Sequence, residues 1–260
     1  MAWRFGRGVV LAILLGGLGC GTAAGDGWQV QFEEARYEVS WGLVPAGIGM
    51  FRATPLEDGG VALRAQICSN SFVDAIHSVR DQIYTRAVAD GGELRPVYHR
   101  VTQIEGGDRK ETITQFTGDG RAYVRKRNKT KVVDVPAAVK DTLTAIYAIR
   151  RLPLKVGATY RLPLLDGDDL KTLVVPVTGR TEVAGESVLE IYPHTEQADQ
   201  SKGQDEWTLL LTDDERRIPV RMKLALSFGK LHLKLKKVRT EPRGDDPREM
   251  FCDPDVRMPR

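Results

Sequence analysis

The chain is poor in the residues that build metal and redox sites. It contains four histidines and three cysteines among 260 residues, and no two histidines stand at the close spacing of a metal-binding pair. The histidines are His77, His99, His194 and His232. The sequence also lacks a Cys-x-x-Cys pair, a Gly-x-Ser-x-Gly elbow and a glycine-rich phosphate loop before a helix. We therefore expect no metal, no cofactor and no catalytic residue, and we do not expect an enzyme.

An excess of charge of one sign is also missing. Residues 1–24 carry two arginines and no acid, so the rest of the chain has 36 basic and 35 acidic side chains. This balance argues against a nucleic-acid-binding protein. Two local basic clusters remain, residues 125–131 and the group Lys230, Lys234, Lys236 and Lys237. We interpret both as solvated surface, with contact to anionic lipid headgroups as the alternative.

The N-terminal 24 residues have the pattern of an export signal. Arg4 and Arg7 precede an apolar run, residues 9–18, that is too short to span a bilayer stably, and small residues follow it. We predict cleavage after Ala24 and a periplasmic or secreted protein of Gram-negative type. Acylation of Cys20 is the alternative, because Leu18-Gly19-Cys20 resembles a bacterial lipoprotein signal. Only in that case do we expect a membrane-anchored, outer-membrane lipoprotein.

Two cysteines, Cys68 and Cys252, lie in the part of the chain predicted to be exported. An oxidising export compartment favours a disulfide between such a pair. The alternative is one buried thiol and one exposed thiol near the C-terminus.

Residues 136–152 form the one predicted helix. Its apolar positions recur at three- and four-residue spacing, with a tyrosine beside them: Val139, Leu143, Ile146, Ile149 and Tyr147. The helix begins either after Asp141 as its N-cap or at Pro136 as its first residue. It ends before Pro153, which cannot continue it. Asp141 and Arg150 fall on opposite sides of the helix, so each is expected to find its partner elsewhere or in water.

Period-two alternation of apolar and polar residues, interrupted by glycine-rich turns, predicts strands through the rest of the chain. The expected strands are residues 30–32, 37–41, 48–53, 61–67, 83–88, 95–103, 112–116, 122–127, 131–135, 170–177, 188–192, 207–211, 220–226 and 230–236, the last two joined by a hairpin at residues 228–230. The predicted fold class is mainly β: a large curled antiparallel sheet or half-barrel around one central helix. Residues 25–241 form the single expected domain, and residues 242–260 a charged tail.

Three segments resemble motifs of the "domain of unknown function 3108" family of exported bacterial proteins. They are Tyr-Glu-Val-Ser-Trp-Gly at residues 37–42 with Ala-Gly at 46–47, the helical segment 141–150, and the turn and strand at 212–220. The resemblance implies an exported β-rich domain akin to the half-barrels of lipoprotein carriers, which hold a helix in their concavity. It implies no catalytic residue.

These patterns favour a non-catalytic protein of the cell envelope that binds an apolar or lipid-like ligand, such as an acyl chain, inside the curved sheet. The candidate lining residues are Trp41, Leu143, Ile146, Tyr147 and Ile149. The alternative is a structural or interaction protein of the periplasm or outer membrane, with a packed core, an envelope protein as its partner and no ligand.

Overall fold

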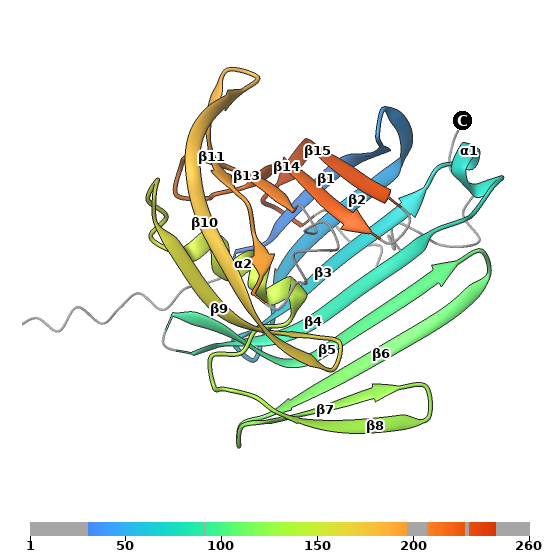
Figure 1. The fold of residues 1–260 in the computed structure, drawn as a ribbon, viewed down its shortest axis with the longest axis vertical. Coiled ribbons are helices and arrows are strands. Elements are labelled where there is room, and N and C mark those ends of the chain that lie inside the picture. Colours follow the sequence, from blue (N-terminus) through green and yellow to red (C-terminus); the bar gives the residue numbers. More distant parts are fainter. Residues whose placement is uncertain (1–30, 91, 197–206, 227–228, 243–260) are drawn as a thin grey trace, which may run out of the picture.

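A single antiparallel sheet of 15 strands makes up most of the part of the chain that the computed structural model describes, residues 31–90, 92–196, 207–226 and 229–242 (Figure 1). The predicted export signal with Cys20, the hairpin residue Phe228, the tail and Cys252 lie outside these residues. The proposed cleavage, acylation and disulfide therefore stay predictions.

The strands follow one another closely along the chain. Their bounds are β1 Glu33–Trp41, β2 Val44–Pro55, β3 Gly60–Ser69, β4 Arg80–Asp90, β5 Glu93–Glu105, β6 Asp108–Thr117, β7 Arg121–Lys126, β8 Lys129–Asp134, β9 Thr159–Asp166, β10 Asp169–Val183, β11 Glu186–Ile191, β12 His194–Thr195, β13 Thr208–Thr212, β14 Pro219–Leu226 and β15 Gly229–Arg239. Two helices interrupt them, α1 Ser71–Asp74 and α2 Thr142–Arg151. No helix in the described residues is long and apolar enough to cross a membrane.

The sheet is not closed into a barrel. Its strand order is β12-β10-β11-β13-β14-β15-β1-β2-β3-β4-β5-β6-β7-β8, with β9 paired to β10. Strand β1 pairs with both β2 and β15, which brings the two ends of the described chain to the middle of the sheet. The mainly β, antiparallel fold class is thus confirmed.

Three details of the predicted strands differ from the structure. Residues 31 and 32 were predicted as part of a strand but are not in one. Strand β1 begins at Glu33, where its pairing with β2 starts. Strands β9 and β12 were not predicted. Pro163 interrupts the alternation of β9 and has no N–H to give to a ladder, and β12 has only two residues.

Helix α2 starts after Asp141, so the alternative start at Pro136 is wrong. The Asp141 carboxylate accepts hydrogen bonds from the amides of Leu143 and Thr144, and the Thr144 hydroxyl accepts one from the Asp141 amide. This capping box satisfies orphan amides of the first turn. The residues before it form a turn, in which the Val139 amide donates to the Pro136 carbonyl over 3.0 Å, and Lys140 then exchanges backbone hydrogen bonds with β9.

The core is divided by α2 and the segment that leads into it. Leu143 and Tyr147 pack with residues of β2 to β5, while Ala145 and Ile149 pack with residues of β1, β9 to β11 and β13 to β15. Val135 and Val139 pack with Leu165 of β9 and with β7. Strand β9 therefore meets the β7–β8 end of the sheet through this lead-in segment instead of through a strand ladder.

Ion pairs also cross between the two ends of the sheet. Lys126 and Lys131 of the β7–β8 hairpin both contact the carboxylate of Asp168 in the β9–β10 turn, the latter at 3.2 Å. One of the two predicted basic clusters is thus partly neutralised within the molecule.

Candidate functional site

The N-terminus of α2 sits on a fully buried polar network. The Asp141 carboxylate is 0% exposed, and Thr85 donates a hydrogen bond to its Oδ1 over 3.0 Å. His99 Nδ1 lies 3.2 Å from the same oxygen and 2.8 Å from the Thr85 hydroxyl. Burial acts to raise the pKa of Asp141, but His99 and the hydrogen bonds from Thr144 outweigh it and lower that pKa. Asp141 thus finds its expected partner outside the helix.

A threonine, a histidine and an aspartate in contact invite comparison with a nucleophilic triad. A triad uses both imidazole nitrogens, one toward the nucleophile and one toward the acid. Here Thr85 and Asp141 both contact Nδ1 of His99, and all three side chains are buried. The arrangement therefore ties the N-terminus of α2 to β4 and β5.

An apolar cavity lies along the face of α2 that is turned toward β9, β10, β13 and β14. Its volume is about 40 Å³. The lining residues are Thr142, Ala145, Ile146, Ile149, Leu164, Leu173, Pro193, Trp207, Thr208, Leu209, Met222 and Leu224. In the part of the chain that the structure describes, no charged side chain lines it.

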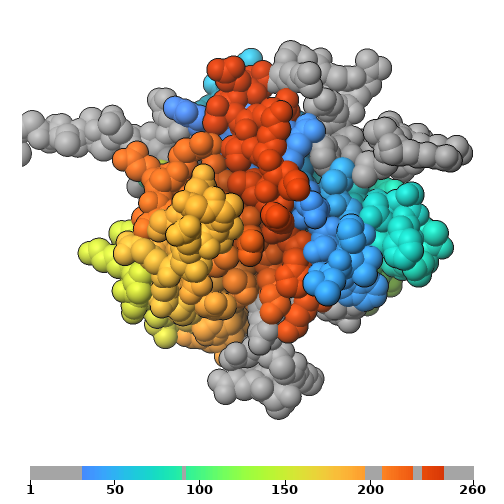
Figure 2. Space-filling model, turned by 90° about the horizontal axis from the view of Figure 1, so that it is seen from above, coloured from blue at the N-terminus to red at the C-terminus, as the bar shows by residue number. Residues whose placement is uncertain are grey.

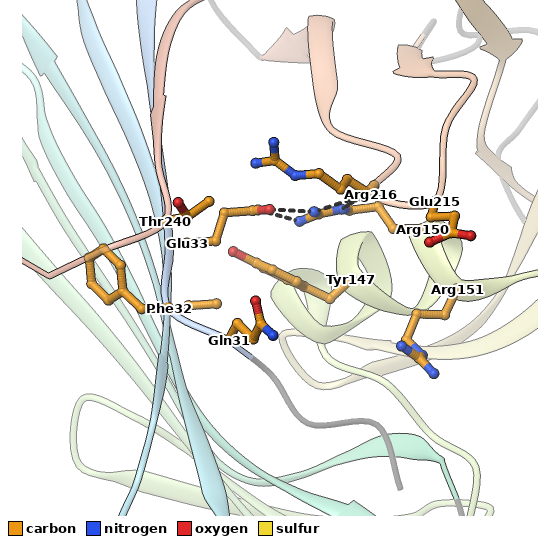
Figure 3. A pocket seen from close by; sticks show the side chains of 10 residues that line it. Gln31, Phe32, Glu33, Tyr147, Arg150, Arg151, Glu215, Arg216 and Thr240 are labelled. Atoms are coloured by element: carbon orange, nitrogen blue, oxygen red, sulfur yellow. Dashed lines mark hydrogen bonds and ion pairs between the residues drawn. The ribbon is translucent and has the colours of Figure 1, made fainter. Parts of the chain in front are cut away.

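A second cavity of about 250 Å³ lies at the C-terminal end of α2 (Figure 3). The Arg150 guanidinium donates two hydrogen bonds to the Glu33 carboxylate, over 2.8 and 2.9 Å, and a third to the carbonyl of Arg216 over 2.9 Å. Burial acts to lower the pKa of Arg150, and the bonds to Glu33 more than offset this. Glu33 is thus the distant partner expected for Arg150.

Tyr147 forms part of the wall of this charged cavity. Its ring lies beneath the Arg150 guanidinium, 5.1 Å from the centroid, and its hydroxyl points toward strand β1 (Figure 3). Burial raises the pKa of the hydroxyl, so it stays a neutral donor. Arg151, Glu215 and Arg216 also line the cavity, which makes it a poor place for a purely apolar chain.

The five candidate lining residues do not share one surface. Ile146 and Ile149 line the apolar cavity, Tyr147 lines the charged cavity, and Leu143 is 1% exposed within the core. Trp41 lines neither cavity and is 51% exposed. It is the last residue of β1, two positions after the buried Val39, and the described residues leave half of its surface exposed.

Several cavity residues were not predicted from the sequence. Trp207, Leu209, Met222 and Leu224 belong to segments more than 50 residues from α2 in the chain. Alternation placed residues 207–211 and 220–226 in strands, but it does not say which helix face these strands meet. Knowledge of the strand pairing would have shown which face of α2 these residues meet.

No group of three or more potential metal ligands occurs in residues 31–242 as far as the structure describes them. The acidic segment 213–215 forms a turn. Asp214 accepts hydrogen bonds from the Thr212 hydroxyl, over 2.5 Å, and from the Arg217 amide, over 2.9 Å, while Asp213 pairs with Arg180 at 2.6 Å.

These features define a mainly β protein in which a helix packs against one unclosed antiparallel sheet. The chain belongs to the family described as "Protein of unknown function (DUF3108)", whose model matches residues 36–236. No curated protein matches the sequence.

One solved structure supports the fold class. A β-barrel-like protein of the domain of unknown function DUF1849 from Brucella abortus has a TM-score of 0.58 at 12% identity, covering 82% of this chain and 99% of that one. Two weaker likenesses carry no argument about the fold. A DUF1089 family protein from Pseudomonas aeruginosa has a TM-score of 0.37 at 12% identity, covering 66% of this chain and 87% of that one. LprF from Mycobacterium bovis has a TM-score of 0.31 at 11% identity, covering 84% of this chain and 90% of that one.

Proposed function

We propose that this protein is a non-catalytic module of the cell envelope that binds an apolar or lipid-like ligand beside α2. The observation that carries the proposal is the apolar cavity, because it lies where an unclosed sheet meets a helix and its described lining carries no charge. A binding site for an acyl chain needs such a lining, since burying a polar group without a partner is costly.

The size of the cavity sets a condition on binding. Sites for small molecules usually measure about 300 to 1,000 Å³, whereas this cavity measures about 40 Å³. A ligand therefore enters by displacing side chains. Ile146 is half-buried on the cavity wall and Met222 is flexible by nature, so these are the residues expected to move.

The small volume itself favours a second candidate function, a structural or interaction protein with a packed core. Under that reading the cavity is an ordinary packing defect. Filling it should then stabilise the protein, because packing defects cost free energy in proportion to their volume.

One experiment separates the two functions. The unmodified protein and Ile146→Trp are purified without detergent, extracted with organic solvent and examined by mass spectrometry for lipid. The binding function predicts lipid in the unmodified protein and its loss in Ile146→Trp. Lipid in neither protein, together with a higher unfolding temperature for Ile146→Trp, would support the packed core instead.

We further propose that the chain is exported, begins at Gly25 after processing and carries a Cys68–Cys252 disulfide. Cys68 is 2% exposed on β3, a position at which a bond to the tail would fix it against the sheet. Intact mass under non-reducing and reducing conditions gives the N-terminus and the bond together. A diacylglyceryl mass on Cys20 would contradict the cleavage site.

A further inference from the structure

Strands β3 to β7 have a face that is turned away from α2. Strand β15 lies beside β1, and β2 follows on the other side of β1 (Figure 2, red next to blue). The sheet continues from there through β3 to β7. Helix α2 contacts β3, β4 and β5 from within the curve of the sheet (Figure 1). We call the opposite side of strands β3 to β7 the outer face.

Alternation decides which side chains reach the outer face. Leu63 of β3 and Val124 of β7 are buried in the core. Thr85 of β4 and His99 of β5 contact Asp141 at the N-terminus of α2. Successive side chains point to opposite faces of a strand, so the residues next to these inward-facing ones point outward.

Strand pairing aligns the outward residues of five strands. Arg64 pairs with Tyr84, and Tyr84 pairs with Arg100. Arg100 then pairs with Ile113, and Ile113 pairs with Arg125. We call Arg64, Arg100 and Arg125 the arginine row. All three are exposed, and because adjacent strands lie about 4.8 Å apart, their backbones are spaced about 10 Å apart along one line.

Four further arginines on these strands have acidic partners within the molecule. The pairs are Arg80 with Asp74, Arg86 with Asp58, Arg109 with Glu111 and Arg121 with Asp119. In the part of the chain that the structure describes, no acid lies at ion-pair distance from a member of the arginine row. The row is thus set apart from the other arginines of the face.

The acids nearest to the arginine row are already engaged. Glu34 lies two strands from Arg64 and accepts hydrogen bonds from three other arginines. Glu111 lies on a diagonal from the other two members of the row, and its ion-pair partner is Arg109, at 3.6 Å. The outer face therefore keeps a net positive charge when both acids are counted.

Tyrosines lie among these arginines. The Arg64 guanidinium is 5.5 Å from the centre of the Tyr84 ring, and that ring is 6.1 Å from the ring of Tyr98. Tyr98 and Tyr123 both pair with Gln115 of β6, one step along the strands from the arginine row. The three tyrosines are half-buried and Gln115 is exposed. A tyrosine offers an apolar ring together with a hydroxyl that donates and accepts hydrogen bonds.

We propose that the arginine row and these tyrosines bind a linear acidic polysaccharide, a chain of sugar rings that carry carboxylates. A guanidinium matches a carboxylate through two parallel hydrogen bonds. The regular spacing of the row suits a polymer that carries charge at repeated intervals. The tyrosines and Gln115 supply apolar surface and hydrogen bonds for the rings and hydroxyls between the charges. The site lies on the opposite side of the sheet from α2, so it does not depend on whether the cavity beside α2 takes a ligand.

Two other anionic partners fit the charge of the outer face but not its remaining side chains. Single-stranded nucleic acid stacks its bases on aromatic faces, and the Arg64 guanidinium already lies over the ring of Tyr84. An anionic bilayer takes apolar side chains into its interface, whereas Ile113, the aliphatic residue between two members of the row, is half-buried. Both partners are therefore comparison ligands in the test.

Titration calorimetry of the purified protein with polygalacturonate tests the proposal. Neutral dextran, oligothymidylate and phosphatidylglycerol vesicles are the comparison ligands. Arg100→Gln removes one charge of the row, Arg100→Lys keeps the charge but not the planar fork, and a triple variant adds Arg64→Gln and Arg125→Gln to Arg100→Gln. Lys155→Gln is the matched control, because it removes one exposed positive charge between α2 and β9.

We expect saturable binding of polygalacturonate and no binding of dextran. Arg100→Gln should weaken binding about tenfold, Arg100→Lys should weaken it less, and the triple variant should not bind. Lys155→Gln should bind as the parent does, and about 1 M salt should weaken binding because it shortens the screening length. The substituted side chains are exposed, so the variants are expected to fold, and their unfolding temperatures verify it.

Three results would overturn the proposal. They are the absence of binding to polygalacturonate, an equal loss in Lys155→Gln and Arg100→Gln, and tighter binding of oligothymidylate or of the vesicles than of polygalacturonate.

Discussion

Asp141 shows most clearly how a single residue connects the chain. Its carboxylate caps α2 within the sequence and contacts Thr85 and His99 of β4 and β5 across the fold. The cap could be predicted from the sequence, since capping depends on residues three positions apart. The partners could not, because contacts between residues 42 or more positions apart depend on strand pairing. Glu33 and Arg150, 117 positions apart, are the same case.

Replacing this carboxylate tests the buried network. We expect Asp141→Ala to lower the free energy of unfolding by about 2 to 4 kcal/mol, because it removes a helix cap and leaves buried donors without an acceptor. Urea unfolding followed by circular dichroism measures the change. Thr142→Ala, in the next position, is the control and should cost far less. Equal losses in the two variants would mean that the network adds nothing beyond helix propensity.

Asp81 gives a prediction for the pH dependence of stability. Burial, and then the nearby Glu105, raise its pKa to about 6 from an ordinary value of 3.8. The folded protein therefore binds this proton more tightly than the unfolded chain. The resulting stabilisation is complete below about pH 4 and is lost as the pH rises through about 6.

Asp81→Asn should remove that part of the pH profile. At pH 7 we expect the variant to be more stable by about 1 to 2 kcal/mol, a range that allows for partial exposure of the carboxyl. Urea unfolding at pH 4.5 and pH 7 provides the measurement. A variant that loses stability at pH 7, or that keeps the slope of the parent protein, would contradict the assignment.

Helix α2 is the element most important to the proposed function, because its two sides pack against different surroundings. Leu143 is 1% exposed in a packed core, whereas Ile146 lines a cavity and is only half-buried. The amphipathic pattern predicted both as buried. Periodicity gives the direction of a side chain but not the packing density that it meets.

The two side chains should therefore respond differently to truncation. Leu143→Ala should cost about 2 to 5 kcal/mol and Ile146→Ala less, because the surroundings of Ile146 already have unfilled space. Thermal and urea unfolding of both variants test this. A larger loss for Ile146→Ala would mean that the cavity wall is packed as tightly as the core. Ile146→Asp should be severely destabilising in either case, because it buries an unpaired charge.

At the scale of the whole molecule, alternation and glycine turns predicted a mainly β, antiparallel fold, and the family resemblance is confirmed. The strand order could not be predicted from the sequence. Pairing of β1 with β15 joins segments at opposite ends of the described chain, and β9 pairs with β10 on one edge and meets the lead-in to α2 on the other. The cavity exists because of these long-range pairings, so its lining was predicted only in part.

The central claim is that the apolar cavity beside α2 binds an acyl chain. The most direct measurement is a calorimetric titration of the delipidated protein with fatty acids of increasing chain length, repeated on Ile146→Trp. The account predicts saturable binding to the unmodified protein, with affinity rising about fourfold for each added CH₂, and no binding to Ile146→Trp. Absence of binding to the unmodified protein, or equal binding to both, would contradict it.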